Sequence, residues 1–397
     1  MLSSRISVPL PPTPETEDIL SAALSSLFTD DTQTNHGTPG SSVVYHSPRL
    51  GNIGLRIPAH PDVEEGRKLF AHYLWNSGVI AADAIETASH EQDGDDDEKK
   101  DDEDKSFDRT LEGGHEIQDA TETPWTWNRK YWDVRSKRVL ELGAGTALPS
   151  LICALSGAAS TTITDHPSSP ALTTGAIEQN VKANVSDRKQ TVDVDDSNST
   201  PGQPGLSSEP DTHTISSKPN HTISSQPNPN PNPNPNPNPV VHVFGYTWGT
   251  GKMYLPNHYG KPAPRQPDGF DRIIVADCLW MPSQHTNLVK TVLRYLDPLR
   301  PDSYALVVAG FHTGRAIVRH FFHVATGEWK DEDPDPDPET ASQDQDPEVA
   351  EVQGRLKAVE MFEVDVNGTR RPWQPARDGE TKVDTRRWCV CAVLVRR

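Results

Sequence analysis

Short runs of β-branched and other apolar residues alternate with longer stretches of helical spacing across the middle of the chain. The runs predict strands and the stretches between them predict helices. Strands are expected at Arg138–Leu142, Thr161–Thr164, Val240–Tyr246, Arg272–Ala276 and Tyr304–Ala309. Helices are expected at Leu148–Ser156, Ser168–Asn184, Gln284–Leu296 and Ala316–Val324. This alternation predicts an α/β fold, with a doubly wound, mainly parallel sheet and helices on both faces.

Further elements flank this pattern on both sides. Glu64–Thr87 has mostly helical spacing interrupted by Gly78, which predicts a helix, a break and a second helix. Lys357–Val366 and Arg387–Val395 are rich in β-forming residues and no helix is expected between them. We therefore expect these two strands to pair as an antiparallel hairpin at one edge of the sheet.

The composition limits how much of the chain can build a core. Hydrophobic residues make up only 34% of the sequence, and the 36 prolines exceed average usage. We predict a disordered N-terminal segment at residues 1–40 and a single domain at residues 41–397. Ser/Pro/Asn-rich, Asp-Pro and acidic tracts predict disordered insertions in that domain at about 86–120, 186–239 and 331–350.

The formal net charge of −19 is concentrated in two acidic tracts, Glu91–Lys105 and Asp331–Glu348. The remainder is close to neutral, which argues against a nucleic-acid partner. The tracts either solvate the protein or attract a basic protein partner. No apolar run resembles a signal peptide or is long enough for a membrane helix, so we expect no membrane partner and a cytoplasmic location, with the nucleus as a second one.

The four cysteines show no metal-ligand spacing, so neither a metal site nor a disulfide framework is expected. Cys389 and Cys391 alternate within a predicted strand and therefore face the same side of it. Core packing is the commoner role for such a pair.

The apolar run before Gly143 ends at two glycines, Gly143 and Gly145, and a predicted helix begins at Leu148. Glycines in such a turn let the backbone approach a ligand, and free N–H groups at the helix start point toward it. Asp165 ends the next strand about twenty residues later, where ribose hydroxyls lie in a Rossmann-type unit. The set indicates a nucleoside cofactor; the alternative is an ordinary turn with surface acids.

Two residues favour S-adenosylmethionine over the dinucleotide cofactors. The third glycine of the dinucleotide fingerprint would fall at Leu148, which disfavours NAD and FAD. Glu141 stands two residues before Gly143, where a carboxylate can influence a bound ammonium. S-adenosylmethionine carries an amino acid in place of a pyrophosphate, so it is the favoured cofactor.

Several further motifs occur in order along the chain. They are Leu74–Gly78 before a helix, Glu141–Pro149, Thr164–Pro167, Asn180 with Asn184, Tyr246–Gly249, Ala276–Trp280 and Phe311–Arg315. With these motifs the chain resembles the seven-strand S-adenosylmethionine methyltransferases, and within them the family-16 group of protein-lysine and nicotinamide-type enzymes. The last motif looks like the fungal branch of nicotinamide N-methyltransferase-like and elongation-factor methyltransferase-like proteins. The resemblance implies a Rossmann-like seven-strand sheet.

The resemblance also implies positions around the cofactor. Gly143 and Gly145 would lie under the methionine part, Asp165 on the ribose hydroxyls, and Trp248 beside the adenine. Trp75 would border the cofactor. Both tryptophans have the alternative of a core role.

Asp277 is the best catalytic candidate from the sequence. A carboxylate there can hold an ammonium or help it lose a proton, or it can only cap the helix Gln284–Leu296 or bind the cofactor. Trp280 offers an aromatic wall to a lysine or to a pyridine. His312 and His285 are candidate proton carriers, with a structural role as the alternative.

The resemblance implies an S-adenosylmethionine-dependent N-methyltransferase acting on a protein lysine or N-terminal amine, for example on a translation elongation factor. One alternative is a small-molecule enzyme that methylates nicotinamide or a similar pyridine. Another is a catalytically silent methyltransferase-like scaffold that acts through its acidic tracts. The sequence leaves the acceptor and the oligomeric state open.

Overall fold

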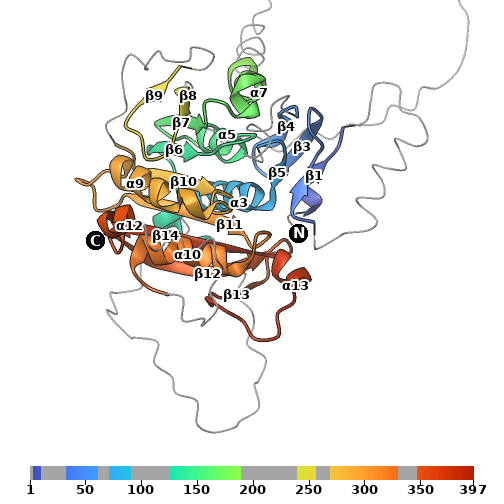
Figure 1. Ribbon diagram of the computed structural model, residues 1–397. Coiled ribbons are helices and arrows are strands. Elements are labelled where there is room, and N and C mark those ends of the chain that lie inside the picture. The colour runs from blue at the N-terminus through green and yellow to red at the C-terminus, as the bar shows by residue number, and fades with distance from the viewer. Residues whose placement is uncertain are drawn as a thin grey trace, which may run out of the picture.

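A sheet of nine strands runs through the centre of the molecule in the order β13-β12-β14-β11-β10-β6-β7-β8-β9 (Figure 1). The computed structural model describes residues 3–9, 33–60, 71–90, 126–188, 239–255, 269–329 and 347–397. The strands of this sheet are β6 (Arg138–Leu142), β7 (Ser160–Asp165), β8 (Val241–Tyr246), β9 (Met253–Tyr254), β10 (Arg272–Ala276), β11 (Tyr304–Gly310), β12 (Leu356–Asp365), β13 (Arg370–Pro372) and β14 (Trp388–Arg396).

The five predicted parallel strands are confirmed. Strand β6 lies between β10 and β7, and β8, β7, β6, β10 and β11 all run in the same direction. After β6 the chain adds β7 and β8 next to one edge of β6, and it later adds β10 and β11 next to the other edge. Ligands bind at the carboxyl ends of the strands where the strand order reverses in this way.

The antiparallel pairing of the two C-terminal strands is confirmed. The expectation that no helix lies between them is wrong, because β13 and the short helix α13 (Lys382–Arg386) come between β12 and β14 in the chain. β14 pairs antiparallel with both β12 and β11. Cys389 and Cys391 of β14 are both buried, in agreement with a packing role. The short edge strands β9 and β13 were not predicted from the sequence.

Helices cover both faces of the sheet, as predicted. On one face lie α3 (Asn76–His90), α4 (Arg129–Trp132) and α5 (Leu148–Leu155); on the other lie α9 (His285–Tyr295), α10 (Arg315–Thr326) and α12 (Pro347–Val352). Strand residues alternate between the two cores: Leu306 and Val308 belong to the first, and Ala305 and Val307 to the second.

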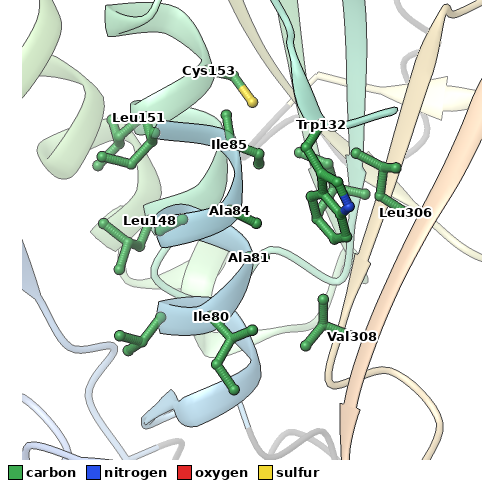
Figure 2. Packing of buried hydrophobic residues seen from close by; sticks show 14 of the residues in the cluster. Ile80, Ala81, Ala84, Ile85, Trp132, Leu148, Leu151, Cys153, Leu306 and Val308 are labelled. Atoms are coloured by element: carbon green, nitrogen blue, oxygen red, sulfur yellow. The ribbon is translucent and has the colours of Figure 1, made fainter. Parts of the chain in front are cut away.

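The first core is built around α3, which packs against α5 and β11 (Figure 2). Its Ala81 and Ala84 are fully buried, and such small side chains let the helix approach its neighbours closely. The predicted break at Gly78 is wrong, because Gly78 lies inside α3 and is buried there. The expected helix before it is wrong at Leu74–Trp75, which form the short strand β5, while residues 64–70 lie outside the described residues.

The predicted helix Ser168–Asn184 is broken into separate parts. These are α6 (Pro170–Thr173), α7 (Ala176–Val181) and a π-helical turn at Lys182–Ser186. Gly175 separates α6 from α7 with a φ of 70°, a left-handed conformation that glycine adopts without strain.

The predicted disorder of residues 1–40 is wrong for part of that range. Ile6–Ser7 form β1, which joins β3 (Ser42–Ser47) and β4 (Gly51–Arg56) in a small antiparallel sheet. Asn35–His36 form β2, which pairs with β5. Residues 10–32 lie outside the described residues.

Most of each predicted insertion lies outside the described residues, and the ends differ where the structure describes them. Helix α3 continues to His90, helical structure extends to Arg188, and α12 begins at Pro347. The remaining parts are 91–120, 189–238 and 331–346. Among the helices that the structure describes, none has the length and apolar character of a transmembrane segment.

Candidate active site

A cavity of about 260 Å³ opens at the carboxyl ends of β6, β7, β8 and β10, where the strand order reverses. Its lining brings together eight residues that the sequence singled out: Trp75, Glu141, Gly143, Gly145, Asp165, Trp248, Asp277 and Trp280. The first and the last of them, Trp75 and Trp280, are more than two hundred residues apart in sequence, so their convergence is a property of the fold. His312 does not line the cavity.

The floor of the cavity is the turn between β6 and α5. Gly143 and Gly145 have φ values of 64° and 54°, which explains the choice of glycine at both positions. A Cβ atom on Gly143 would also lie 2.7 Å from the Sγ atom of Cys278 and 3.3 Å from Cζ2 of Trp248. The absence of a side chain at Gly143 therefore allows Cys278 and Trp248 to close over the turn.

Asp165 ends β7 and fixes this turn. Its Oδ2 atom accepts a hydrogen bond of 2.8 Å from the backbone N–H of Gly145, and Oδ1 accepts one of 2.7 Å from the N–H of His166. The N–H of Gly145 is therefore engaged by Asp165, which supplies a donor to the buried carboxylate. Burial raises the pKa of Asp165 despite these bonds.

Glu141 is the more deeply buried carboxyl, with 1% of the residue exposed. Its Oε2 atom accepts a hydrogen bond of 3.1 Å from the N–H of Ser150 in the first turn of α5. Burial raises the pKa of Glu141 to about 8. Because Glu141 also lines the cavity, a cation bound there would favour the ionised carboxylate.

Asp277 follows β10 and adopts a φ of 60°, which is uncommon outside glycine. Its backbone N–H donates to the carbonyl of Val308, and its Oδ1 atom accepts a hydrogen bond of 3.1 Å from the N–H of Gly310. The alternative of a helix cap is wrong: α9 begins at His285, and Asp277 caps neither it nor the short turn before it. The contacts hold the carboxylate of Asp277 at the cavity.

His312 lies behind the cavity wall. Its ring stacks on that of Trp75, with centroids 4.7 Å apart and an interplanar angle of 17°. Its Nδ1 atom lies 3.8 Å from Oδ1 of Asp277 and has no hydrogen-bond partner among the described residues. The His312 side chain is 18% exposed, against 6% for that of Asp277, so His312 is the more accessible of the two.

Two other candidates from the sequence have structural contacts. His285 is fully buried, its Nε2 lies 2.9 Å from the carbonyl of Leu279, and its Nδ1 lies 2.7 Å from Nδ1 of His320. Burial lowers the pKa of His285 to about 3, which leaves it neutral. Arg315, the last residue of the Phe311–Arg315 motif, forms ion pairs with Glu363 and Glu380 away from the cavity lining.

The Asn180 and Asn184 pair also has a structural role. The side chain of Asn180 bonds to the backbone of Arg56 and to the carbonyl of Thr146, and Asn184 donates to the carbonyl of Gly54. These bonds attach β4 to α7 and to the π-helical turn after it, and they attach α7 to the turn before α5.

Sequence reasoning missed several lining residues. Among them are Ala71, Tyr73, His166, Met281 and Gln284. Tyr73 had a usable signal, because it precedes Trp75 by two residues and alternate residues of an extended segment face the same side. Ala71 and Gln284 carried no such signal.

The comparisons with known proteins agree with this geometry. Residues 62–196 match the family model described as lysine methyltransferase. The resemblance to the family-16 methyltransferases is confirmed. The matched region includes β5, the glycine turn and Asp165, and so covers the part of the family motif set that builds the cavity floor.

Curated relatives are fungal proteins named protein N-terminal and lysine N-methyltransferase EFM7. The one from Emericella nidulans is 29% identical over 179 residues, which cover 44% of this chain and 48% of the relative. The one from Yarrowia lipolytica is 24% identical over 247 residues, covering 62% of this chain and 58% of the relative. The chain thus spans about half the length of the curated relatives it matches.

A SAM-dependent methyltransferase structure from Methanosarcina mazei is 13% identical with a TM-score of 0.30, covering 67% of this chain and 94% of that one.

Proposed function

We propose that this protein is an S-adenosylmethionine-dependent N-methyltransferase whose acceptor is a lysine or N-terminal amine of another protein. The observation that carries the proposal is the single cavity lining that joins a glycine turn, two buried carboxyls, aromatic side chains and Asp277. The names of the curated relatives support a protein amine as the acceptor.

The lining fits the cofactor in its chemistry. Glu141 would face the ammonium of the methionine part, Asp165 would hold the ribose hydroxyls, and Trp248 would lie beside the adenine. The glycine turn leaves room under the methionine part, since a side chain at Gly143 would collide with Cys278. When bound, S-adenosylmethionine supplies a methyl group activated by a sulfonium.

Asp277 and His312 suit an acceptor that arrives protonated. A lysine or terminal amine carries a proton at neutral pH and must lose it before nitrogen can act as a nucleophile. The carboxylate of Asp277 would bind the ammonium and receive that proton. His312, 3.8 Å away and partly exposed, would pass it to solvent. Trp280 and Trp75 would form aromatic walls around the alkyl chain of the amine.

This proton path separates the proposed acceptor from a pyridine. The ring nitrogen of nicotinamide is already neutral at pH 7, so its methylation needs no base beside it. A silent scaffold, the remaining alternative, would not need a carboxylate and a histidine aligned behind the acceptor end. A translation elongation factor, implied by the family resemblance, is the first acceptor to test.

The decisive experiment measures transfer of tritiated methyl groups from S-adenosylmethionine into an extract of cells that lack this protein, with nicotinamide as a parallel substrate. We expect label in one or a few proteins, released as methylated lysine or a methylated N-terminal residue on hydrolysis. Label in nicotinamide alone would overturn the protein acceptor. Calorimetric binding of the cofactor without any transfer would support the scaffold instead.

A further inference from the structure

The short strand β2 reaches the acceptor end of the cavity through its partner β5. Asn35 pairs with Trp75, and His36 pairs with Leu74. Trp75 is the residue that lines the cavity and stacks on His312. A segment far from the methyltransferase motifs in sequence therefore lies directly behind an aromatic wall of the site.

Asn76 is the residue that locks this pairing. Its side-chain Nδ2 donates to the carbonyl of Gln33 at 2.6 Å, and its Oδ1 lies 2.8 Å from Nε2 of His36. Its backbone N–H donates to the carbonyl of Thr34 at 2.9 Å. With 7% of its surface exposed, Asn76 satisfies its polar groups through the segment Gln33–His36.

Two neighbouring elements hold Trp75 in position: the helix α3 that follows it in the chain and the strand β2 that pairs with it. On the C-terminal side the chain enters α3 at Asn76, whose first turn is buried. On the other side the backbone of Trp75 is held by β2. Two residue pairs make a weak strand by themselves, so the contacts of Asn76 supply much of what keeps β2 in place.

We propose that the segment Gln33–His36 positions the indole of Trp75 over His312 and thereby sets the geometry of the acceptor end, with Asn76 as the positioning residue. Misplacement of reacting groups by about 1 Å can cost roughly 10²-fold in rate. The effect on turnover rests on the proposed function, whereas the effect on the Trp75–His312 stack does not.

Two truncated proteins give a matched test. Removal of residues 1–32 deletes β1 and keeps Gln33–His36; removal of residues 1–36 deletes β1 and this segment together. The two differ only in the proposed positioning segment. The NMR resonance of the His312 ring, assigned with His312→Gln, reports the stack because the indole ring current shields a stacked imidazole.

We expect the shorter truncation to match the full chain in both readouts. The longer one should shift the His312 resonance downfield and lower the rate of methyl transfer into the cell extract at saturating cofactor by roughly tenfold to a hundredfold. It should still bind S-adenosylhomocysteine in calorimetry. An unchanged resonance, or an unchanged rate with a shifted resonance, would overturn the proposal.

Point variants keep the test open if the longer truncation does not fold. His36→Ala removes the partner of the Asn76 oxygen and should reproduce part of both changes, whereas His36→Gln keeps a donor and should restore them. Equal behaviour of His36→Ala and the full chain would count against the proposal. The two proposals can also be separated. If the full-length protein methylates no acceptor, the proposed function is wrong; a shifted His312 resonance in the longer truncation would still support the positioning role.

Discussion

A Cβ atom placed on Gly143 would lie 2.7 Å from the Sγ atom of Cys278, closer than real Cβ contacts come. Gly143→Ala should therefore destabilise the protein through crowding and through the left-handed backbone, by roughly 2–4 kcal/mol in total. Cofactor affinity should fall as well, because the turn forms the cavity floor. Chemical denaturation and calorimetry measure the two effects.

Gly145→Ala is the matched control for this variant. Gly145 has a similar φ of 54°, yet the nearest atom to its added Cβ is 3.9 Å away. It should show the backbone strain of about 1–2 kcal/mol without the crowding. Gly143→Ala should thus lose more unfolding free energy than Gly145→Ala. Adding Cys278→Ala to Gly143→Ala should remove this difference, and a double variant as unstable as Gly143→Ala would contradict the crowding argument.

Glu141→Gln tests the buried carboxyl in the first strand. A carboxyl whose pKa is raised by burial from 4.5 to about 8 binds more protons in the folded than in the unfolded state. Its contribution to the free energy of unfolding is therefore complete below pH 4.5 and is lost as pH rises toward 8. We expect Glu141→Gln to be more stable than the wild type at pH 8 and to show a flatter pH dependence.

The same variant should bind S-adenosylmethionine more weakly if Glu141 faces the cofactor ammonium as proposed, because glutamine cannot become an anion. Wild-type affinity should rise between pH 6 and pH 8, whereas that of Glu141→Gln should not. Glu351→Gln, at a side chain with 68% exposure, is the control and should change neither quantity. A tighter complex in Glu141→Gln would rule out the ammonium assignment.

Asp165→Ala should lose both ligand affinity and stability. Removing a charged hydrogen-bond partner costs roughly 1.5–3 kcal/mol, or about one to two orders of magnitude in cofactor affinity. The protein should remain folded but lose about 1–3 kcal/mol, since the N–H of Gly145 loses its acceptor. Calorimetry showing normal affinity in the folded variant would refute the ribose assignment.

Asp277→Asn tests the proton path. Asparagine tolerates a φ of 60° and keeps the size of the side chain, so the backbone should not change. With a protein amine as acceptor we expect turnover to fall by roughly 10²-fold or more, and the loss to shrink as pH rises and more amine arrives neutral. Rates equal to wild type across pH, with normal cofactor binding, would exclude a role for this carboxylate.

Local sequence signals predicted the centre of the molecule well. The run Arg138–Leu142, its two glycines and the helix from Leu148 each depend on near neighbours in sequence, and the cavity floor follows from them. Gly78 misled because its flexibility suggested a break, whereas in the structure it lies in the first turn of α3 without a left-handed φ. Gly175 did interrupt a helix, and only its left-handed φ in the folded chain distinguishes the two cases.

The N-terminal elements had no comparable signal. Ile6–Ser7 and Asn35–His36 are two-residue strands that exist only because distant partners supply their hydrogen bonds. The Trp75–His312 stack and the contacts of Asn76 are equally non-local. Residue types at the site could thus be predicted from motifs, whereas the partners that orient them required the fold.

The place of β14 between β11 and β12 has a consequence for biosynthesis. The ribosome makes residues 388–396 after every other strand of the central sheet, yet this strand separates two strands made earlier. Until it emerges, β11 and β12 each expose an unpaired edge, which invites association between nascent chains. Chaperone dependence should therefore be greatest late in translation, and a stop codon before residue 388 should yield an aggregating product rather than a folded protein of lower stability.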